Sequence, residues 1–193
     1  MRNRRMTRER FLSDSELERF MAAVRQRRHV HQPRDHALFA LLANTGMRPS
    51  EALALTRGDV HPKARPPWMH VERSWKKHAP QPIRDLVLNK AVAKVVAAYL
   101  GNLGKDSSQR LFPFTKRQSQ RLFQHYAKKA TITPRRKIYA LRHTVGMRLW
   151  RHTHDIRLIQ AIMGHVRQKA TAAYVHSPPE KLRAAYELLG TVE

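Results

Sequence analysis

A histidine and a tyrosine near the C-terminus are the residues whose spacing first suggests chemistry. His165 precedes Tyr174 by nine residues, and His176 follows two residues after the tyrosine. A tyrosine hydroxyl has a pKa of about 10, so it is a poor nucleophile until its surroundings activate it. Arg48 and Arg142 could provide that activation by neutralising a phosphate. Together these residues suggest a tyrosine that attacks a phosphodiester of DNA.

Arg48 lies in the segment 45–51, Thr-Gly-Met-Arg-Pro-Ser-Glu, where one helix should end and another begin. Gly46 is a residue type that commonly ends a helix, and Pro49 suits the first turn of the next. The free N–H groups and positive end of the new helix would favour an anion beside Arg48. Glu51 is the obvious acid to pair with Arg48, and such a pair can orient the guanidinium while its other edge faces a ligand. A plain ion pair is the alternative.

The composition predicts a polyanionic partner. The chain has 193 residues, enough for one domain, and 41% of them are hydrophobic. Its formal charge of +24 and pI of about 11.5 point first to nucleic acid and second to an anionic membrane surface. No apolar run approaches the roughly 18 residues of a membrane span, and no signal peptide is evident. Cysteine is absent, which fits a reducing cytosol. We therefore expect a cytoplasmic protein, associated with the nucleoid when bound to DNA.

The hydrophobic pattern predicts a mostly α fold with one small antiparallel β-hairpin or sheet, an α+β class. Ser13 and Glu16 form a capping-box pattern that opens the first helix. The only strand signals are at 68–73 and 83–88, with Lys76 and Lys77 near the tip of the hairpin between them. Further helices are expected over 35–45, from Pro49, and over 90–101, 117–130, 140–151, 155–163, from about 169, and over 179–189.

Basic residues gather in three places. Residues 1–10 form an Arg-rich arm, which is either a solvated tail or a contact with the DNA backbone. The helix 117–130 and the loop after it carry further positive side chains. They suit a surface that tracks a phosphate backbone, or a face that is merely solvated. The candidates are Arg117, Arg121, Lys128, Lys129, Arg135, Arg136 and Lys137.

Three short boxes resemble those of the catalytic domain of the tyrosine recombinase (phage integrase) family. They are residues 45–51, residues 141–144 (Leu-Arg-His-Thr), and residues 163–165 (Met-Gly-His) with Tyr174 downstream. The boxes come in that family's order and at its spacings, and the resemblance runs over residues 11–189. It implies a catalytic domain over 11–193, preceded by the arm 1–10 and without the N-terminal core-binding domain of most members.

The resemblance also implies a mechanism. Arg48 and Arg142 would grip the non-bridging oxygens of the scissile phosphate, as a planar guanidinium can. Tyr174 would attack the phosphorus, forming a 3′-phosphotyrosyl link and releasing a 5′-hydroxyl. Lys77 or Lys76 would protonate the leaving oxygen.

The remaining roles implied by the family include one departure. His165 would donate a hydrogen bond to the phosphate, and neither a metal nor another cofactor is needed. The family usually has histidine three residues before the second arginine, but here that position is Tyr139. Tyrosine can hydrogen-bond a phosphate but is a poor general base near neutral pH.

The other histidines are ambiguous. His143 and His176 are candidate supporting residues, although such histidines are more often structural. By composition, a metal could be held by His152, His154, His165 or His176, but no carboxylate–histidine spacing supports such a site.

The sequence therefore predicts a site-specific DNA recombinase or integrase that acts on duplex DNA. The family implies a homotetramer on DNA, with helix 179–189 as the contact between protomers or as a helix packed on its own core. Accessory DNA-bending proteins are further candidate partners. Two alternatives stay open: a catalytically silent DNA-binding relative acting as a regulator or accessory factor, and a relaxing enzyme resembling type IB topoisomerases.

Overall fold

The structure is a computed structural model that describes residues 10–26, 29–71, 84–133 and 136–164. The helices in this part are α1 (Asp14–Gln26), α2 (Gln32–Thr45), α3 (Pro49–Ala52), α4 (Lys90–Gly101), α5 (Lys116–Lys129), α6 (Tyr139–Thr153) and α7 (Ile156–Met163). A short 3₁₀ turn, η2 (Arg57–Asp59), precedes the strands β1 (Val60–His61), β2 (Trp68–Val71) and β3 (Arg84–Val87). None of the helices described here has the length and apolar character needed to cross a bilayer.

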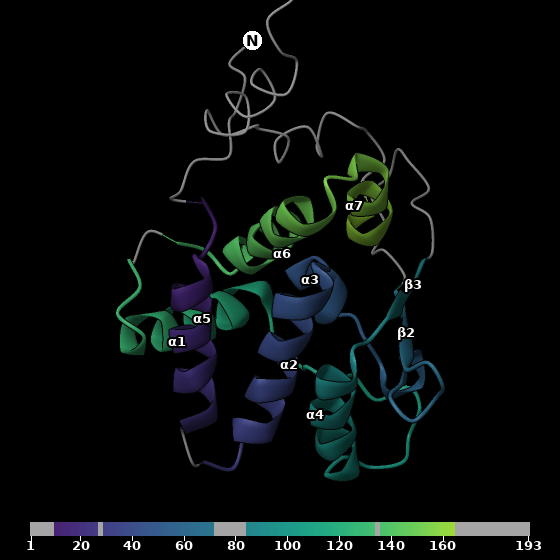
Figure 1. The fold of residues 1–193 in the computed structure, drawn as a ribbon. Coiled ribbons are helices and arrows are strands. Elements are labelled where there is room, and N and C mark those ends of the chain that lie inside the picture. The colour runs from purple at the N-terminus through teal and green to yellow at the C-terminus, as the bar shows by residue number, and fades with distance from the viewer. Residues whose placement is uncertain (1–9, 27–28, 72–83, 134–135, 165–193) are drawn as a thin grey trace, which may run out of the picture.

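Helix α2 runs through the middle of the fold, and α1, α4 and α6 pack against it (Figure 1). Residues 37–43 of α2 are all buried, so this helix is apolar around its whole circumference. Aromatic rings fill the space between α1, α2 and α5. The ring of Phe20 lies 5.0 Å from that of Phe39 and 5.2 Å from that of Phe123, measured between centroids. The C-terminal end of α2 therefore projects from a rigid core.

Helix boundaries follow the local signals. The predicted capping box at α1 is present, because Ser13 N donates to Glu16 Oε2 at 2.7 Å and Glu16 N donates to Ser13 Oγ at 3.2 Å. Helix α2 begins three residues before the predicted start, with a proline in its first turn. Gly46 ends α2 in the left-handed conformation, with φ of 65°.

The sheet is antiparallel and has the order β1-β2-β3. Met69 of β2 pairs with Val60 on one side and Leu86 on the other, and all three side chains are buried. The small antiparallel sheet predicted from the sequence is thus confirmed. Strand β1 was missed because two residues are too few for an alternating pattern to show.

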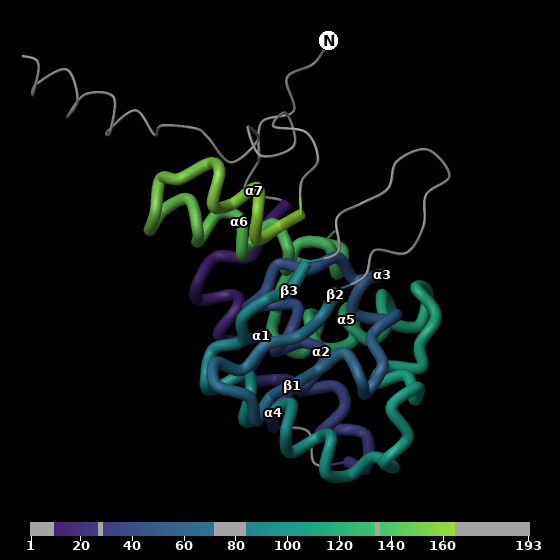
Figure 2. Tube along the Cα trace, turned by 90° about the vertical axis from the view of Figure 1, so that its right-hand side faces the viewer, coloured from purple at the N-terminus to yellow at the C-terminus, as the bar shows by residue number. Residues whose placement is uncertain are grey.

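Helices α6 and α7 form a layer at one end of the fold, beyond α3 (Figures 1 and 2). Ile159 and Met163 of α7 are buried against Met147, Leu149 and Trp150 of α6. Helix α6 continues to Thr153, two residues past the predicted end, and His154 then adopts a left-handed conformation with φ of 52°. This turn folds α7 back so that its C-terminal end lies close to the end of α2.

Replacement of Gly46 by alanine tests the junction after α2. An added Cβ would lie 3.0 Å from Val145 Cγ1, in a left-handed conformation that already costs an L-residue roughly 1–2 kcal/mol. We expect Gly46→Ala to lower the free energy of unfolding by at least that amount, measured by urea denaturation.

Gly101→Ala is the matched control, because no described residue outside the backbone of α4 and the chain neighbours lies within 4 Å of a Cβ added to this last residue of α4. Alanine favours a helix over glycine by about 1 kcal/mol at most, so this variant should keep or slightly gain stability. Equal effects of the two substitutions would contradict the proposed strain at Gly46.

Candidate active site

Arg48 caps the single-turn helix α3 and pairs with Glu51. Its backbone N–H donates to Glu51 Oε2 at 2.7 Å, and its Nη1 donates to Glu51 Oε1 at 2.7 Å. The ion pair suggested by the sequence is therefore present. The expectation that a helix dipole would attract an anion here is not supported, because α3 has only four residues and carries little macrodipole. The positive charge at this position comes from guanidinium groups instead.

Arg142 lies in the first turns of α6 and is only 1% exposed. Its Nη1 donates to Gly46 O at 2.5 Å, and its Nη2 donates to Met163 O at 2.6 Å. Gly46 closes α2, and Met163 is the last residue of α7. The carbonyl ends of two helices, which carry partial negative charge, thus surround a buried cation.

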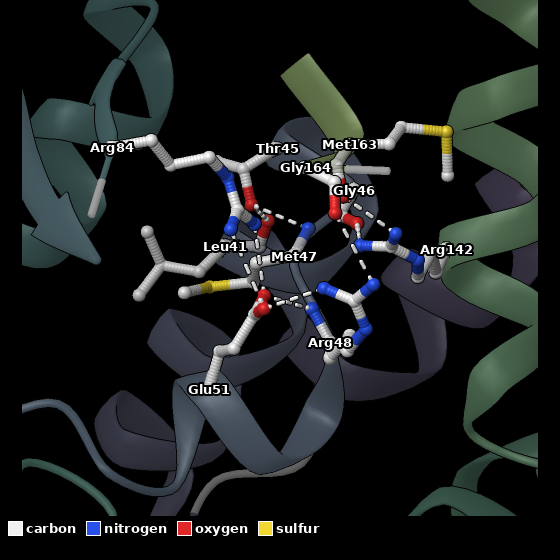
Figure 3. A network of polar contacts seen from close by, with 10 residues as sticks. All are labelled: Leu41, Thr45, Gly46, Met47, Arg48, Glu51, Arg84, Arg142, Met163 and Gly164. Atoms are coloured by element: carbon white, nitrogen blue, oxygen red, sulfur yellow. Dashed lines mark hydrogen bonds and ion pairs between the residues drawn. The ribbon is translucent and has the colours of Figure 1, made fainter. Parts of the chain in front are cut away.

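Arg48 and Arg142 converge on the same turn of the chain (Figure 3). Arg48 Nη2 donates to Gly164 O at 3.3 Å, and Arg142 binds the preceding carbonyl, that of Met163. Segments that lie far apart in the sequence therefore meet at the turn formed by Met163 and Gly164. Both guanidiniums therefore lie at the end of α7, and Arg142 is the more deeply buried of the two.

Arg84, the first residue of β3, is a site residue that the sequence reading missed. Its Nη2 donates to Glu51 Oε2 at 2.9 Å. The alternation of the strand gave a partial signal, because Arg84 shares a strand face with Leu86 and should point inward, but it did not indicate which residue Arg84 meets there. A charged residue on the buried face of a strand predicts a charge partner.

Glu51 stays ionised although it is 1% exposed. Burial alone would raise the pKa of its carboxyl, but hydrogen bonds and charge from Arg84, with hydrogen bonds from Arg48, lower that pKa below 4.5. Among the described residues, Glu51 is shared by the guanidiniums of Arg48 and Arg84, whereas Arg142 binds backbone carbonyls (Figure 3).

Tyr139 begins α6 and lies beside the second arginine. Its ring centroid is 6.0 Å from Arg142 Cζ and 5.1 Å from the ring of His143, and the residue is 39% exposed. An exposed aromatic ring next to a buried guanidinium is placed where it could contact a ligand of that guanidinium. The assignment of a role to Tyr139 remains a prediction.

Several predicted residues lie outside the described part of the chain: Lys76, Lys77, Arg135, His165, Tyr174, His176, the arm 1–9 and the expected helix 179–189. Two described residues next to these segments contact the polar cluster: Arg84 binds Glu51, and the carbonyl of Gly164 accepts from Arg48. Arg84 directly follows the segment that holds both lysines, and Gly164 directly precedes His165. The polar cluster thus lies where these two segments join the described fold.

The basic residues proposed for DNA contact divide into two groups. The side chains of Arg117, Arg121, Lys128, Lys129 and Lys137 are exposed. Arg136 is 9% exposed, and its Nη1 binds Glu16 Oε2 at 2.8 Å and the carbonyl oxygen of Phe11. The side chain of Arg136 ties the start of α1 to the loop before α6, and its contact with DNA stays a prediction. Within the described ranges, no three His, Asp or Glu side chains gather as metal ligands.

His143 generates a pH-dependent prediction. Burial, followed by the charges of Arg142 and Arg10, lowers the pKa of His143 from 6.5 to about 4. The unfolded chain binds more protons than the folded one between these values, so the stability contributed by neutral His143 is complete above pH 6.5 and is lost as the pH falls toward 4. From pH 7 to pH 5 this loss is about 2 kcal/mol.

Urea denaturation at pH 7 and pH 5 measures this contribution. The His143→Gln variant should lose about 2 kcal/mol less than the unmodified chain over this interval. Comparing the two proteins at both pH values removes the effects of other groups, such as His36, whose pKa burial and Arg25 also lower. Parallel losses in both proteins would show that His143 does not carry the effect.

Comparison with known proteins gives a consistent assignment. A family model described as "Phage integrase family" matches residues 10–181. The tyrosine recombinase XerD of Shewanella oneidensis is 26% identical over 185 residues, which cover 91% of this chain and 60% of that relative. The chain thus spans little more than half the length of this curated relative.

Two solved structures show the same fold. The crystal structure of the XerA recombinase has a TM-score of 0.71 and 25% identity, covering 95% of this chain and 66% of that one. The Tn1549 transposon integrase in complex with transposon right end DNA has a TM-score of 0.75 and 22% identity, covering 95% of this chain and 67% of that one. Because this family model covers residues 10–181, most of the chain, the chain belongs to the phage integrase family.

Proposed function

We propose that this chain is the catalytic domain of a site-specific tyrosine recombinase that cleaves and rejoins duplex DNA through a 3′-phosphotyrosyl intermediate at Tyr174. The domain would comprise residues 11–193, with residues 1–10 as a basic arm. The observation that carries the proposal is the convergence of Arg48 and Arg142, from different helices, on the carbonyls of Met163 and Gly164. The family match and the strongly basic composition support it.

The two arginines suit the charge that develops during phosphoryl transfer. Arg48 uses two of its five side-chain N–H groups in contacts within the described residues, and its side chain is 17% exposed. Its remaining edge can bind a non-bridging phosphate oxygen. Arg142 is 1% exposed, so its contact with a phosphate requires the turn at Met163 and Gly164 to shift. Both charges would stabilise the crowded transition state.

The other steps are assigned to residues outside the described part. Tyr174 loses its phenolic proton to water and attacks the phosphorus, and the P–O bond to the 5′ oxygen breaks. Lys77 or Lys76 supplies the proton that the 5′ oxygen takes up. His165 donates a hydrogen bond to the phosphate. Rejoining is the reverse attack by a 5′-hydroxyl, so the bond energy is kept and no nucleotide is consumed. Recombination would use a tetramer on two duplexes, with helix 179–189 as the contact between protomers.

A DNA substrate with a nick close to the cleavage point tests the proposal, because loss of the short 5′-hydroxyl fragment traps the covalent intermediate. We expect a protein–DNA adduct that survives denaturation and is absent in Tyr174→Phe. Arg48→Ala should lower the rate of adduct formation about 100- to 1,000-fold. It should retain most DNA affinity, which is spread over many basic residues.

Arg110→Ala is the matched control for this loss of charge, since Arg110 is exposed and lies near the opposite end of α2, by Arg34. DNA binding without an adduct would favour the catalytically silent relative. Relaxation of supercoiled plasmid by highly diluted monomer would favour a topoisomerase-like enzyme. A normal cleavage rate in Arg48→Ala would end the assignment of Arg48 to the phosphate.

Tyr139→His tests the departure from the family pattern. Histidine at the start of α6 would place a group that titrates near neutral pH beside Arg142. We expect adduct formation at pH 7.5 to be maintained or raised, measured with the same nicked DNA. A clear loss of rate would show that the phenol of Tyr139 has a specific role that imidazole does not replace.

A further inference from the structure

The charged side chain of Arg84 is largely withdrawn from solvent, on the inward face of a strand where apolar residues are usual. Its side chain is 10% exposed, on the face of β3 that also carries Leu86. Burying a guanidinium is costly unless it is paired and hydrogen-bonded. Arg84 pairs with Glu51, whose carboxylate also binds Arg48. The role of Arg84 is therefore connected to the proposed phosphate site.

Glu51 forms a bridge between the two arginines. Arg84 grips the carboxylate with both ends of its guanidinium, Nη2 to Oε2 at 2.9 Å and Nη1 to Oε1 at 3.4 Å. Arg48 contacts the same two oxygens through its backbone N–H and its Nη1, at 2.7 Å each. Each carboxylate oxygen therefore accepts from both arginines, and the plane of the carboxylate is fixed from two sides (Figure 3).

A fixed carboxylate plane fixes Arg48 in turn. If Glu51 were held by Arg48 alone, both partners would belong to one helical turn. No group from another element would then hold the carboxylate, and its plane would have some freedom to rotate. The bidentate grip of Arg84 removes this freedom. Arg84 also shares the negative charge of Glu51, so this carboxylate neutralises the charge of Arg48 less completely. Arg48 then keeps both its orientation and its attraction for a phosphate.

Arg84 also contacts the turn that ends α7. A Cβ added to Gly164 would lie 2.6 Å from Arg84 Nη1 and 2.9 Å from its Cζ, so the guanidinium rests directly against the glycine. Gly164 adopts φ of 57°, which an L-residue with a Cβ rarely adopts. The same side chain therefore braces Glu51 on one side and, on the other, the turn whose carbonyl accepts from Arg48.

We propose that Arg84 is a positioning residue for DNA cleavage, which orients Arg48 through the Glu51 carboxylate and braces the turn at Gly164. This inference rests on the proposed recombinase function. Arg84 does not need to touch the phosphate, since its guanidinium is directed at Glu51. Its loss should slow the chemical step while leaving DNA affinity almost unchanged.

Single-turnover cleavage of the nicked DNA, at DNA concentrations well above Kd, separates these effects. We expect Arg84→Gln to form the adduct about 100-fold more slowly, the cost of misplacing a reacting group by about 1 Å. Its Kd should stay within about threefold of that of Arg110→Gln, which removes the same charge from an exposed position. Arg84→Lys should recover only part of the rate, because an ammonium cannot grip both carboxylate oxygens.

A double-variant cycle tests the route through Glu51. If Arg84 acts through this carboxylate, Arg84→Gln in a Glu51→Gln background should slow cleavage less than about threefold further, because the ion pair between Arg84 and Glu51 is already lost. Multiplicative losses in the double variant would overturn the proposal that Arg84 orients Arg48 through Glu51. So would a cleavage rate for Arg84→Gln equal to that of Arg110→Gln.

A measurement without DNA keeps this inference separate from the proposed function. In protein labelled with ¹⁵N-arginine, the Nη signals of Arg48, assigned with Arg48→Lys, should be resolved in the unmodified chain and in Arg110→Gln, because rotation of the guanidinium is hindered. They should merge in Arg84→Gln. Unchanged Nη signals would overturn the positioning role even if cleavage occurs. Absence of any adduct with the unmodified chain would instead refute the recombinase function, while the NMR result still decides whether Arg84 orients Arg48.

Discussion

The burial of several guanidinium groups in one small region is the constraint on which the site depends. Arg142 is 1% exposed and Arg84 has a side chain that is 10% exposed, so each must be compensated inside the protein. Two kinds of compensation are used. Arg84 and Arg48 share the Glu51 carboxylate, whereas Arg142 binds the carbonyl ends of α2 and α7. Among the described side chains of this cluster, two guanidiniums share the single carboxylate of Glu51, so its negative charge is divided between them.

The fold places these compensating groups at one end of a rigid helix. Helix α2 is buried over residues 37–43, so the position of its last residue is set by packing on every side. Gly46 then turns the chain, and its carbonyl accepts from Arg142 within the same junction that delivers Arg48 and Glu51. Arg84 reaches the cluster from the sheet, on the side opposite to Arg142 (Figure 3). A displacement of α2, α6, α7 or β3 would therefore change the contacts of the Glu51 carboxylate or of the Gly46 and Met163 carbonyls.

The positive charge of the chain has more than one use. Arg135, Arg136 and Lys137 made the loop before α6 a candidate for contact with DNA. Arg136 instead turns inward to Glu16, and Arg84, on a strand without an obvious charge pattern, turns inward to Glu51. Composition predicts the sign of the partner's charge. It does not separate the arginines that hold the protein together from those that face outward, since this depends on where the few acidic side chains lie.

Local chemistry in the sequence determined most of the elements and the family. The capping box at Ser13, the glycine after α2 and the alternation in β2 and β3 depend on neighbouring residues, so they could be recognised without a structure. The boxes around Arg48 and Arg142 were likewise visible as short patterns. Tertiary structure alone decided that Arg84 reaches Glu51, that Arg136 is buried, and that Arg142 is held by the ends of α2 and α7. These contacts join residues more than twenty positions apart, and their partners are chosen by the packing of whole helices and strands, for which a single sequence carries no local signal.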